Sequence, residues 1–308
     1  MNENNALSLR LRWWHGVLFY LAALGVELMI VRLLSLLLGV LQALGVMGST
    51  QAGSGTTMRS PLVLSLLVVA INTSLIILAL VGTRRAGGFA ALRLGSTSTA
   101  TLVVASLGVI PAGIVADELT FALHTLAPSF FETGALGTFA QSISAMSATG
   151  FALTSVAVSV GPALGEEMFF RGLVLRSLAA DMPAWAAVSV SALLFGVLHL
   201  DPLQGASATL IGIYLGYVAV VAGSIWPAVL AHAVNNLVYM MLTRLDGSGM
   251  GQPSSNGYHG YPPWLVGVGV ALTAVVAWSL LRRKIGGTCL PDDTGLSRRR
   301  NPSSLTSA

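Results

Sequence analysis

Carboxylates, histidines and asparagines stand in otherwise apolar stretches of this chain, at spacings that place some of them on a common helix face. They form three short motifs: Glu166-Glu167-x-x-x-Arg171, Phe195-x-x-x-His199 and His232-x-x-x-Asn236. An ionisable side chain within a hydrophobic segment is costly and usually functional. The three motifs therefore predict a functional site.

Helix geometry separates the two adjacent carboxylates. Glu167 and Arg171 are four residues apart, so on a helix they lie within about 40° of each other and can pair. Glu166 points about 100° away and has no such partner, which leaves it free for chemistry. By the same geometry, His232 and Asn236 share one face of their helix.

The residue types of these motifs match the needs of amide hydrolysis. A carboxylate such as Glu166 and an imidazole can activate a water as general base. A second imidazole and an asparagine amide can donate hydrogen bonds to the developing oxyanion. Alternatively, Glu166, His199 and His232 form an accepted ligand set for a catalytic Zn²⁺ that would activate the water. The residues alone favour neither route.

The three motifs resemble those of the CAAX-protease and bacteriocin-processing family (CPBP, or Abi), which includes the type II CAAX prenyl endopeptidases. The resemblance covers residues 161–242, about a quarter of the chain. It implies that Glu167 and Arg171 are supporting residues. The family also contains proteins tied to bacteriocin immunity or maturation and to scaffolding, so the resemblance does not define a substrate.

The resemblance assigns a role to each of the other polar motif residues. It implies that Glu166 and His199 activate the attacking water, and that His232 and Asn236 form the oxyanion site. Family members are often described as metalloproteases, although a metal-free glutamate mechanism has also been argued. The implied cofactor is therefore Zn²⁺ held by Glu166, His199 and His232, or no metal.

The composition predicts the setting of this site. Of the 308 residues, 9% are charged and 54% are hydrophobic, and the mean hydropathy is +0.78. A soluble domain carries about 25% charged residues, and a disordered chain is far less apolar. One cysteine excludes a disulfide scaffold, and the basic residues form no nucleic-acid footprint. The sequence predicts an all-α, polytopic membrane helix bundle.

Eight apolar segments are candidate spans of this bundle. They are Val17–Val46, Pro61–Gly82, Thr99–Ala116, Phe139–Leu164, Trp185–His199, Ala206–Ala222, Ile225–Leu242 and Pro263–Leu281. Asp117 and Glu118 are expected to end the third span as solvated charges. Glu27 and Arg32 in the first span are badly spaced for pairing on one helix, so we expect their partners on other helices and a structural role for both.

The loops between the segments indicate orientation and register. In an eight-span arrangement both termini and most basic residues lie on the same side of the membrane. By the positive-inside rule, that side is the cytoplasm. A turn at Asp181-Met182-Pro183 would make the fourth and fifth segments antiparallel. Glu166 and His199 would then lie at one height, about 25 Å from the turn. Gly212-x-x-x-Gly216 predicts close helix packing.

These observations give four regions and one favoured function. Residues 1–138 contain N-terminal helices, 139–243 a CPBP-like catalytic core, 244–284 a loop and the last span, and 285–308 a disordered basic tail. The favoured function is an endopeptidase in a bacterial inner membrane, acting on a membrane protein or lipidated peptide, which is CAAX-like or bacteriocin-related. The alternatives are a non-catalytic immunity or scaffold protein of the same fold and an ion-coupled transporter. No nucleic-acid partner is expected.

Overall fold

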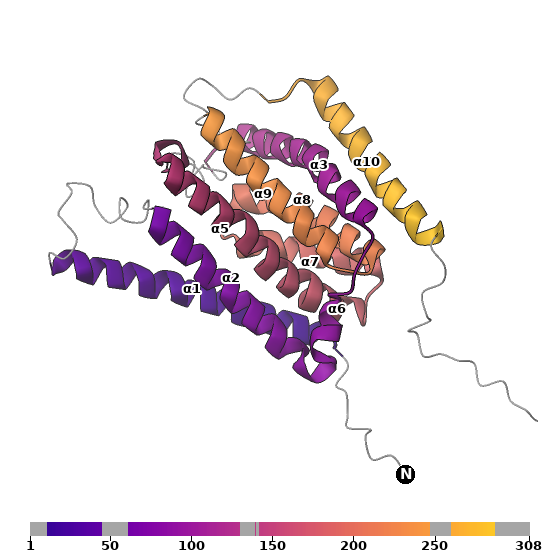
Figure 1. Cartoon of the computed structure of the whole chain (residues 1–308), viewed down its shortest axis with the longest axis horizontal. Coiled ribbons are helices and arrows are strands. Elements are labelled where there is room, and N and C mark those ends of the chain that lie inside the picture. The colour runs from indigo at the N-terminus through magenta and orange to yellow at the C-terminus, as the bar shows by residue number, and fades with distance from the viewer. Residues whose placement is uncertain (1–10, 45–60, 130–138, 140–141, 247–259, 287–308) are drawn as a thin grey trace, which may run out of the picture.

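The computed structural model describes residues 11–44, 61–129, 139, 142–246 and 260–286, and every element in them is helical (Figure 1). The predicted tail, apart from residues 285 and 286, lies outside the described residues. The main helices are α1 (Trp13–Ala43), α2 (Pro61–Thr83), α3 (Thr99–Leu126), α5 (Ala148–Glu167), α6 (Leu175–Ala179), α7 (Ala184–Leu198), α8 (Pro202–Ala222), α9 (Trp226–Asp246) and α10 (Pro263–Gly286). The 3-10 turns η2 (Arg84–Ala86) and η3 (Gly88–Leu92) follow α2, and the π-helical η4 (Met168–Val174) joins α5 to α6.

The predicted membrane helix bundle is confirmed, with six helical stretches in the described residues that are long and apolar enough to cross a membrane. These are Trp13–Leu41, Val63–Thr83, Thr99–Leu126, Ala148–Ala179, Pro202–Ala222 and Pro263–Arg282. The fifth and seventh predicted segments are also helices, α7 and α9. However, α7 is too short for a full span, with only 15 residues. Helix α9 is long enough, but its polar motif residues make it less apolar than a full span.

The fourth predicted segment has different bounds in the structure. Its helix begins at Ala148 rather than Phe139, because the Ser147 hydroxyl accepts a 3.1 Å hydrogen bond from the Gly150 amide and caps the helix. Its C-terminal end is not Leu164, since the helix continues through η4 and α6 to Ala179. The turn predicted at Asp181 follows directly. Both carboxylates of the first motif therefore lie within one continuous helix.

The expectation that Asp117 ends the third span is wrong. Helix α3 continues to Leu126, and Asp117 is buried with 6% of its surface exposed. Two contacts stabilise the carboxylates within the helix: the Tyr261 hydroxyl lies 3.4 Å from Asp117 Oδ2, and the Tyr261 amide donates to Glu118 Oε2 at 2.9 Å. The segment before α10 thus supplies partners that the local sequence around Asp117 does not reveal.

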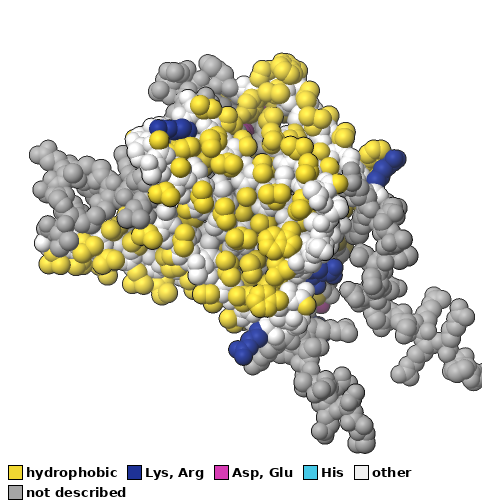
Figure 2. All heavy atoms as spheres, in the orientation of Figure 1, with side chains coloured by type: hydrophobic (Ala, Val, Ile, Leu, Met, Phe, Trp, Pro, Cys, Tyr) yellow, Lys and Arg dark blue, Asp and Glu magenta, His cyan; other side chains and the backbone are white. Residues whose placement is uncertain are grey.

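The helices that carry the motifs lie in the middle of the bundle. In Figure 1, α5, α7, α8 and α9 form the centre, with α1 and α2 on one side and α3 and α10 on the other. Apolar side chains cover most of the face in Figure 2, and the dark-blue basic side chains lie at its margins. This surface fits a lipid environment, in which exposed leucines carry no penalty.

Glycines bring α7 and α8 into backbone contact. A Cβ atom built on Gly196 would overlap the carbonyl oxygen of Gly205, and one on Gly212 would lie 3.2 Å from Ala192. A Cβ on Gly216 would lie 3.1 Å from Val188. The close packing predicted from Gly212-x-x-x-Gly216 is confirmed, and it fixes the α7 segment that leads to His199.

The Gly196–Gly205 contact predicts that Gly196→Ala destabilises the protein. The added methyl must push α8 away, and overpacking of this kind costs about 1–3 kcal/mol. The matched control is Gly25→Ala in α1, where a new Cβ meets nothing within 4 Å. Thermal unfolding in detergent micelles measures both variants, and equal melting temperatures would contradict the prediction.

Candidate active site

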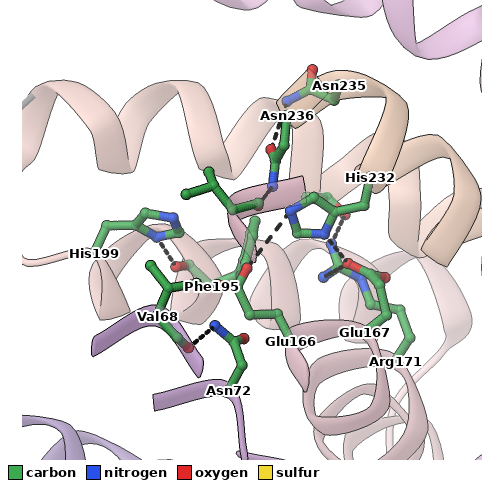
Figure 3. Close-up of polar contacts among 12 residues, drawn as sticks. Val68, Asn72, Glu166, Glu167, Arg171, Phe195, His199, His232, Asn235 and Asn236 are labelled. Carbon is green, nitrogen blue, oxygen red and sulfur yellow. Dashed lines mark hydrogen bonds and ion pairs between the residues drawn. The ribbon is translucent and has the colours of Figure 1, made fainter. Parts of the chain in front are cut away.

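The three motifs converge within the bundle (Figure 3). Glu166 and Glu167 end α5, and Arg171 lies in η4 one turn later. The other groups come from α9, which carries His232 and Asn236, and from the end of α7, where His199 follows the last helical residue. Side chains that are far apart in the sequence are thus assembled by the packing of α5, α7 and α9.

Glu167 is the centre of the hydrogen-bond network. Its Oε1 accepts a 2.9 Å bond from Arg171 Nη1, as predicted, and a 2.8 Å bond from His232 Nδ1, which was not predicted. All three side chains are buried, with exposed fractions of 0% for Glu167, 2% for Arg171 and 4% for His232. One carboxylate oxygen therefore holds α9 against α5 and orients the imidazole.

Arg171 connects this network to two more helices. Its Nη2 donates to the Gly212 carbonyl of α8 at 3.0 Å, and its Cζ lies 4.8 Å from the centre of the Phe195 ring of α7. Such a cation–π contact is strongest when both groups are desolvated. The guanidinium thus neutralises Glu167 and fixes the positions of α7 and α8 relative to η4.

The contact with Glu167 also determines which nitrogen of His232 faces the site. A carboxylate oxygen only accepts hydrogen bonds, so Nδ1 carries the proton. The other nitrogen, Nε2, lies 3.8 Å from Oε2 of Glu166. The side chain of Glu166 keeps 16% of its surface exposed, whereas that of Glu167 keeps none. Of the two adjacent carboxylates, Glu166 is therefore the one that a small molecule can reach.

The imidazole of His199, at the end of α7, is also oriented by a hydrogen bond at Nδ1. Its Nδ1 lies 2.9 Å from the Phe195 carbonyl oxygen, an acceptor, so Nδ1 carries the proton and Nε2 keeps a free lone pair in the neutral ring. In the view of Figure 3 the Glu166 carboxyl lies between the rings of His199 and His232. Both imidazoles interact electrostatically with this carboxyl. The structure thus brings a carboxylate and two imidazoles together.

Asn236 lies above these groups with its side chain engaged elsewhere. Its Nδ2 donates to the Val158 carbonyl of α5 at 3.1 Å, and its Oδ1 accepts a 3.4 Å contact from Asn235 Nδ2. One of the two N–H bonds of Asn236 Nδ2 is used by Val158. The other N–H is the one that can serve as an oxyanion donor, the role that the resemblance implies.

The sequence did not identify Asn72 of α2. Its side chain is buried with 4% exposed, its Nδ2 donates to the Val68 carbonyl, and its Oδ1 lacks a conventional partner in the described residues. A Cβ built on Gly165 would lie 2.6 Å from that oxygen. Asn72 thus packs against the backbone immediately before Glu166. The sequence did contain one indication of a role for Asn72, since it is a polar residue within an apolar segment. It was not singled out because it belongs to none of the three motifs.

The resemblance implies Zn²⁺ held by Glu166, His199 and His232 as one alternative. Within the described ranges, no group of three or more His, Cys, Asp or Glu side chains is placed to hold a metal ion. The zinc hypothesis stays a prediction that chelation can test.

Comparison with known families agrees with the motifs. Residues 148–238 match the family model described as type II CAAX prenyl endopeptidase Rce1-like. Comparisons with curated proteins and with solved structures gave no match. The matched region begins with α5 and reaches into α9, so it contains all three motifs. Residues 148–238 of this integral membrane protein are therefore similar to a type II CAAX prenyl endopeptidase Rce1-like domain.

Proposed function

We propose that this protein is an intramembrane endopeptidase that uses a water activated by Glu166. The observation that carries the proposal is the difference between two adjacent carboxylates. Glu167 is sealed between Arg171 and His232, whereas Glu166 stays accessible and faces an imidazole nitrogen. The substrate is a membrane protein or a lipidated peptide, of CAAX-like or bacteriocin-related type, that reaches the site within the bilayer.

The first step is deprotonation of the water. Glu166 accepts one proton, while Nε2 of His199 accepts a hydrogen bond from the other O–H. Both acceptors then lie on one side of the water, and its oxygen lone pair is directed at the scissile carbonyl. General-base catalysis of this kind contributes about 10²–10⁴-fold.

The second step moves the proton to where negative charge develops. Nε2 of His232 lies 3.8 Å from Glu166 Oε2, and it can take the proton that Glu166 received. The resulting imidazolium is stabilised by Glu167 at Nδ1 and donates Nε2–H to the oxyanion, together with the remaining N–H of Asn236. The tetrahedral intermediate then collapses, the C–N bond breaks, and the proton passes to the leaving nitrogen.

The proposal predicts that Glu166→Gln abolishes peptide cleavage. An amide of the same shape cannot take the proton, so the rate should fall by about 10²–10⁴-fold. The measurement uses the full chain in liposomes and a quenched-fluorescent farnesylated CAAX peptide. Glu118→Gln is the control, because that carboxylate belongs to none of the three motifs and accepts a hydrogen bond from the Tyr261 amide.

The outcomes of this experiment separate the competing functions. If wild-type protein cleaves and Glu166→Gln does not, at equal protein level, the hydrolase proposal is supported. If Glu166→Gln cleaves as well as wild type, the proposed mechanism is wrong. A protein that protects cells from a bacteriocin equally well with either residue is an immunity protein, and ion flux that depends on Glu166 indicates a transporter.

The buried network predicts that stability and activity separate in a double variant. Arg171→Met removes the cationic partner of the buried Glu167 and leaves it only the hydrogen bond from His232, which costs about 3–5 kcal/mol. Adding Glu167→Gln removes that charge and should restore much of the melting temperature. Cleavage should stay low, because the amide no longer stabilises a protonated His232. A double variant with wild-type turnover would contradict the positioning role of Glu167.

The mechanism uses side chains alone, so it predicts resistance to chelators. Incubation with 1,10-phenanthroline, followed by its removal, should leave the cleavage rate within about twofold, well below the 10–100-fold losses typical of perturbed metal sites. The control is a known zinc protease in the same liposomes. A loss of activity that added Zn²⁺ restores would instead support the zinc hypothesis for Glu166, His199 and His232.

A further inference from the structure

Glu27 of α1 is a buried carboxylate that the mechanism above does not use. It is 9% exposed, and among the described residues no hydrogen bond or ion pair is found for it. Arg32, its nearest basic neighbour on α1, is exposed. The expectation that Glu27 pairs with a basic residue on another helix thus finds no such partner in the described part of the chain.

Two contacts give the register of α1 against the catalytic helix. A Cβ on Gly16 would lie 3.0 Å from the Ser177 side chain, and the ring of Tyr20 lies 6.4 Å from that of Phe170. As α1 advances, its contacts therefore move backwards along α6 and η4, so the helices are antiparallel. Glu27 is seven residues, about 10 Å, beyond Tyr20. It consequently reaches the level of residues 163–166.

The packing of α1 against α2 gives an independent estimate of the height of Glu27 in the bundle. A Cβ on Gly82 would lie 3.2 Å from the Phe19 ring, and α1 and α2 pack against each other. Because α1 and α2 run antiparallel, each step forward from Phe19 along α1 corresponds to a step back from Gly82 along α2. Glu27, eight residues after Phe19, therefore lies at the level of residue 74 of α2. Asn72 lies half a turn away and contacts Gly165. Both registers thus place Glu27 at the height of Glu166.

The exposure pattern of α1 shows which way Glu27 points. Tyr20, Ala23 and Glu27 are buried and share one helix face, while Leu21 and Leu28 are exposed on the other. Glu27 therefore faces the bundle. The carboxyls of Glu27 and Glu166 interact electrostatically, which agrees with the register.

The charges at this level do not balance within the described residues. Glu167 is paired with Arg171, and Glu166 faces His232, but Glu27 forms no ion pair with any basic side chain in the described part of the chain. An unpaired carboxylate within a membrane bundle is costly, and such groups usually face a cavity or a ligand pathway. A basic group that enters with the substrate would supply the missing partner.

We propose that Glu27 is a specificity-determining residue, which binds a lysine or arginine side chain of the substrate next to the scissile bond. This inference rests on the proposed peptidase function. It assigns α1, which lies outside the matched domain, a direct part in substrate selection.

The test compares two farnesylated CAAX peptides that differ only in carrying lysine or norleucine beside the scissile bond. Wild-type protein in phosphatidylethanolamine–phosphatidylglycerol liposomes should prefer the lysine peptide by about tenfold in kcat/KM, the effect of about 1.4 kcal/mol. Glu27→Gln should lose this preference through a higher KM for the lysine peptide. It should still cleave the norleucine peptide, and Glu27→Asp should retain part of the preference.

Matched variants make each outcome decisive. Met29→Gln changes the exposed face of the same helix and should keep the preference, and Glu27→Lys should favour a glutamate peptide. Equal cleavage of the lysine and norleucine peptides by wild type, or an equal loss of both in Glu27→Gln, would overturn the inference. Cleavage by Glu166→Gln would instead overturn the peptidase mechanism, so the two failures are distinguishable.

Discussion

The site depends on one carboxylate oxygen, Oε1 of Glu167, which accepts hydrogen bonds from both Arg171 and His232. Burying a single charge in this bundle would be prohibitive, but the guanidinium balances the charge of this carboxylate and the imidazole N–H adds a second hydrogen bond to Oε1. The other oxygen, Oε2, is buried without a hydrogen-bond partner in the described residues. Because Arg171 also bonds to α8 and contacts the Phe195 ring of α7, this small buried network joins four helical segments. The positions of the reactive groups follow from it.

The same network explains how two adjacent glutamates come to differ. Consecutive helix residues diverge by about 100°, so when Glu167 points into the sealed network Glu166 must point elsewhere. It points toward the imidazole nitrogen that Glu167 has left without a proton. A structural carboxylate and a reactive one are thus produced from one dipeptide, and the orientation of the first determines the environment of the second.

Local spacing was enough to predict the Glu167–Arg171 pair, the turn after α6 and the close packing at Gly212, since each depends on residues within a few positions. The bond between Glu167 and His232 joins residues 65 apart, and Asn72 reaches Gly165 from another helix, so spacing within a helix carries no information on either. Asp117 shows the same limit: its burial depends on Tyr261, a contact between segments distant in the sequence. The roles of Asn236 and of a metal stay predictions.

The matched domain spans α5 to α9, but the structure shows that these helices do not enclose the site alone. Asn72 from α2 packs against the residue before Glu166, and α1 brings Glu27 to the same height. In the proposed mechanism, bond cleavage needs only the groups fixed around Glu167, which belong to the matched region. Under the proposed function, recognition of the substrate has different requirements, because a substrate at Glu166 would also meet α1 and α2, which lie outside the matched region. A division of this kind lets the same catalytic network serve different substrates, through changes in α1 and α2 that leave Glu167 and its partners undisturbed.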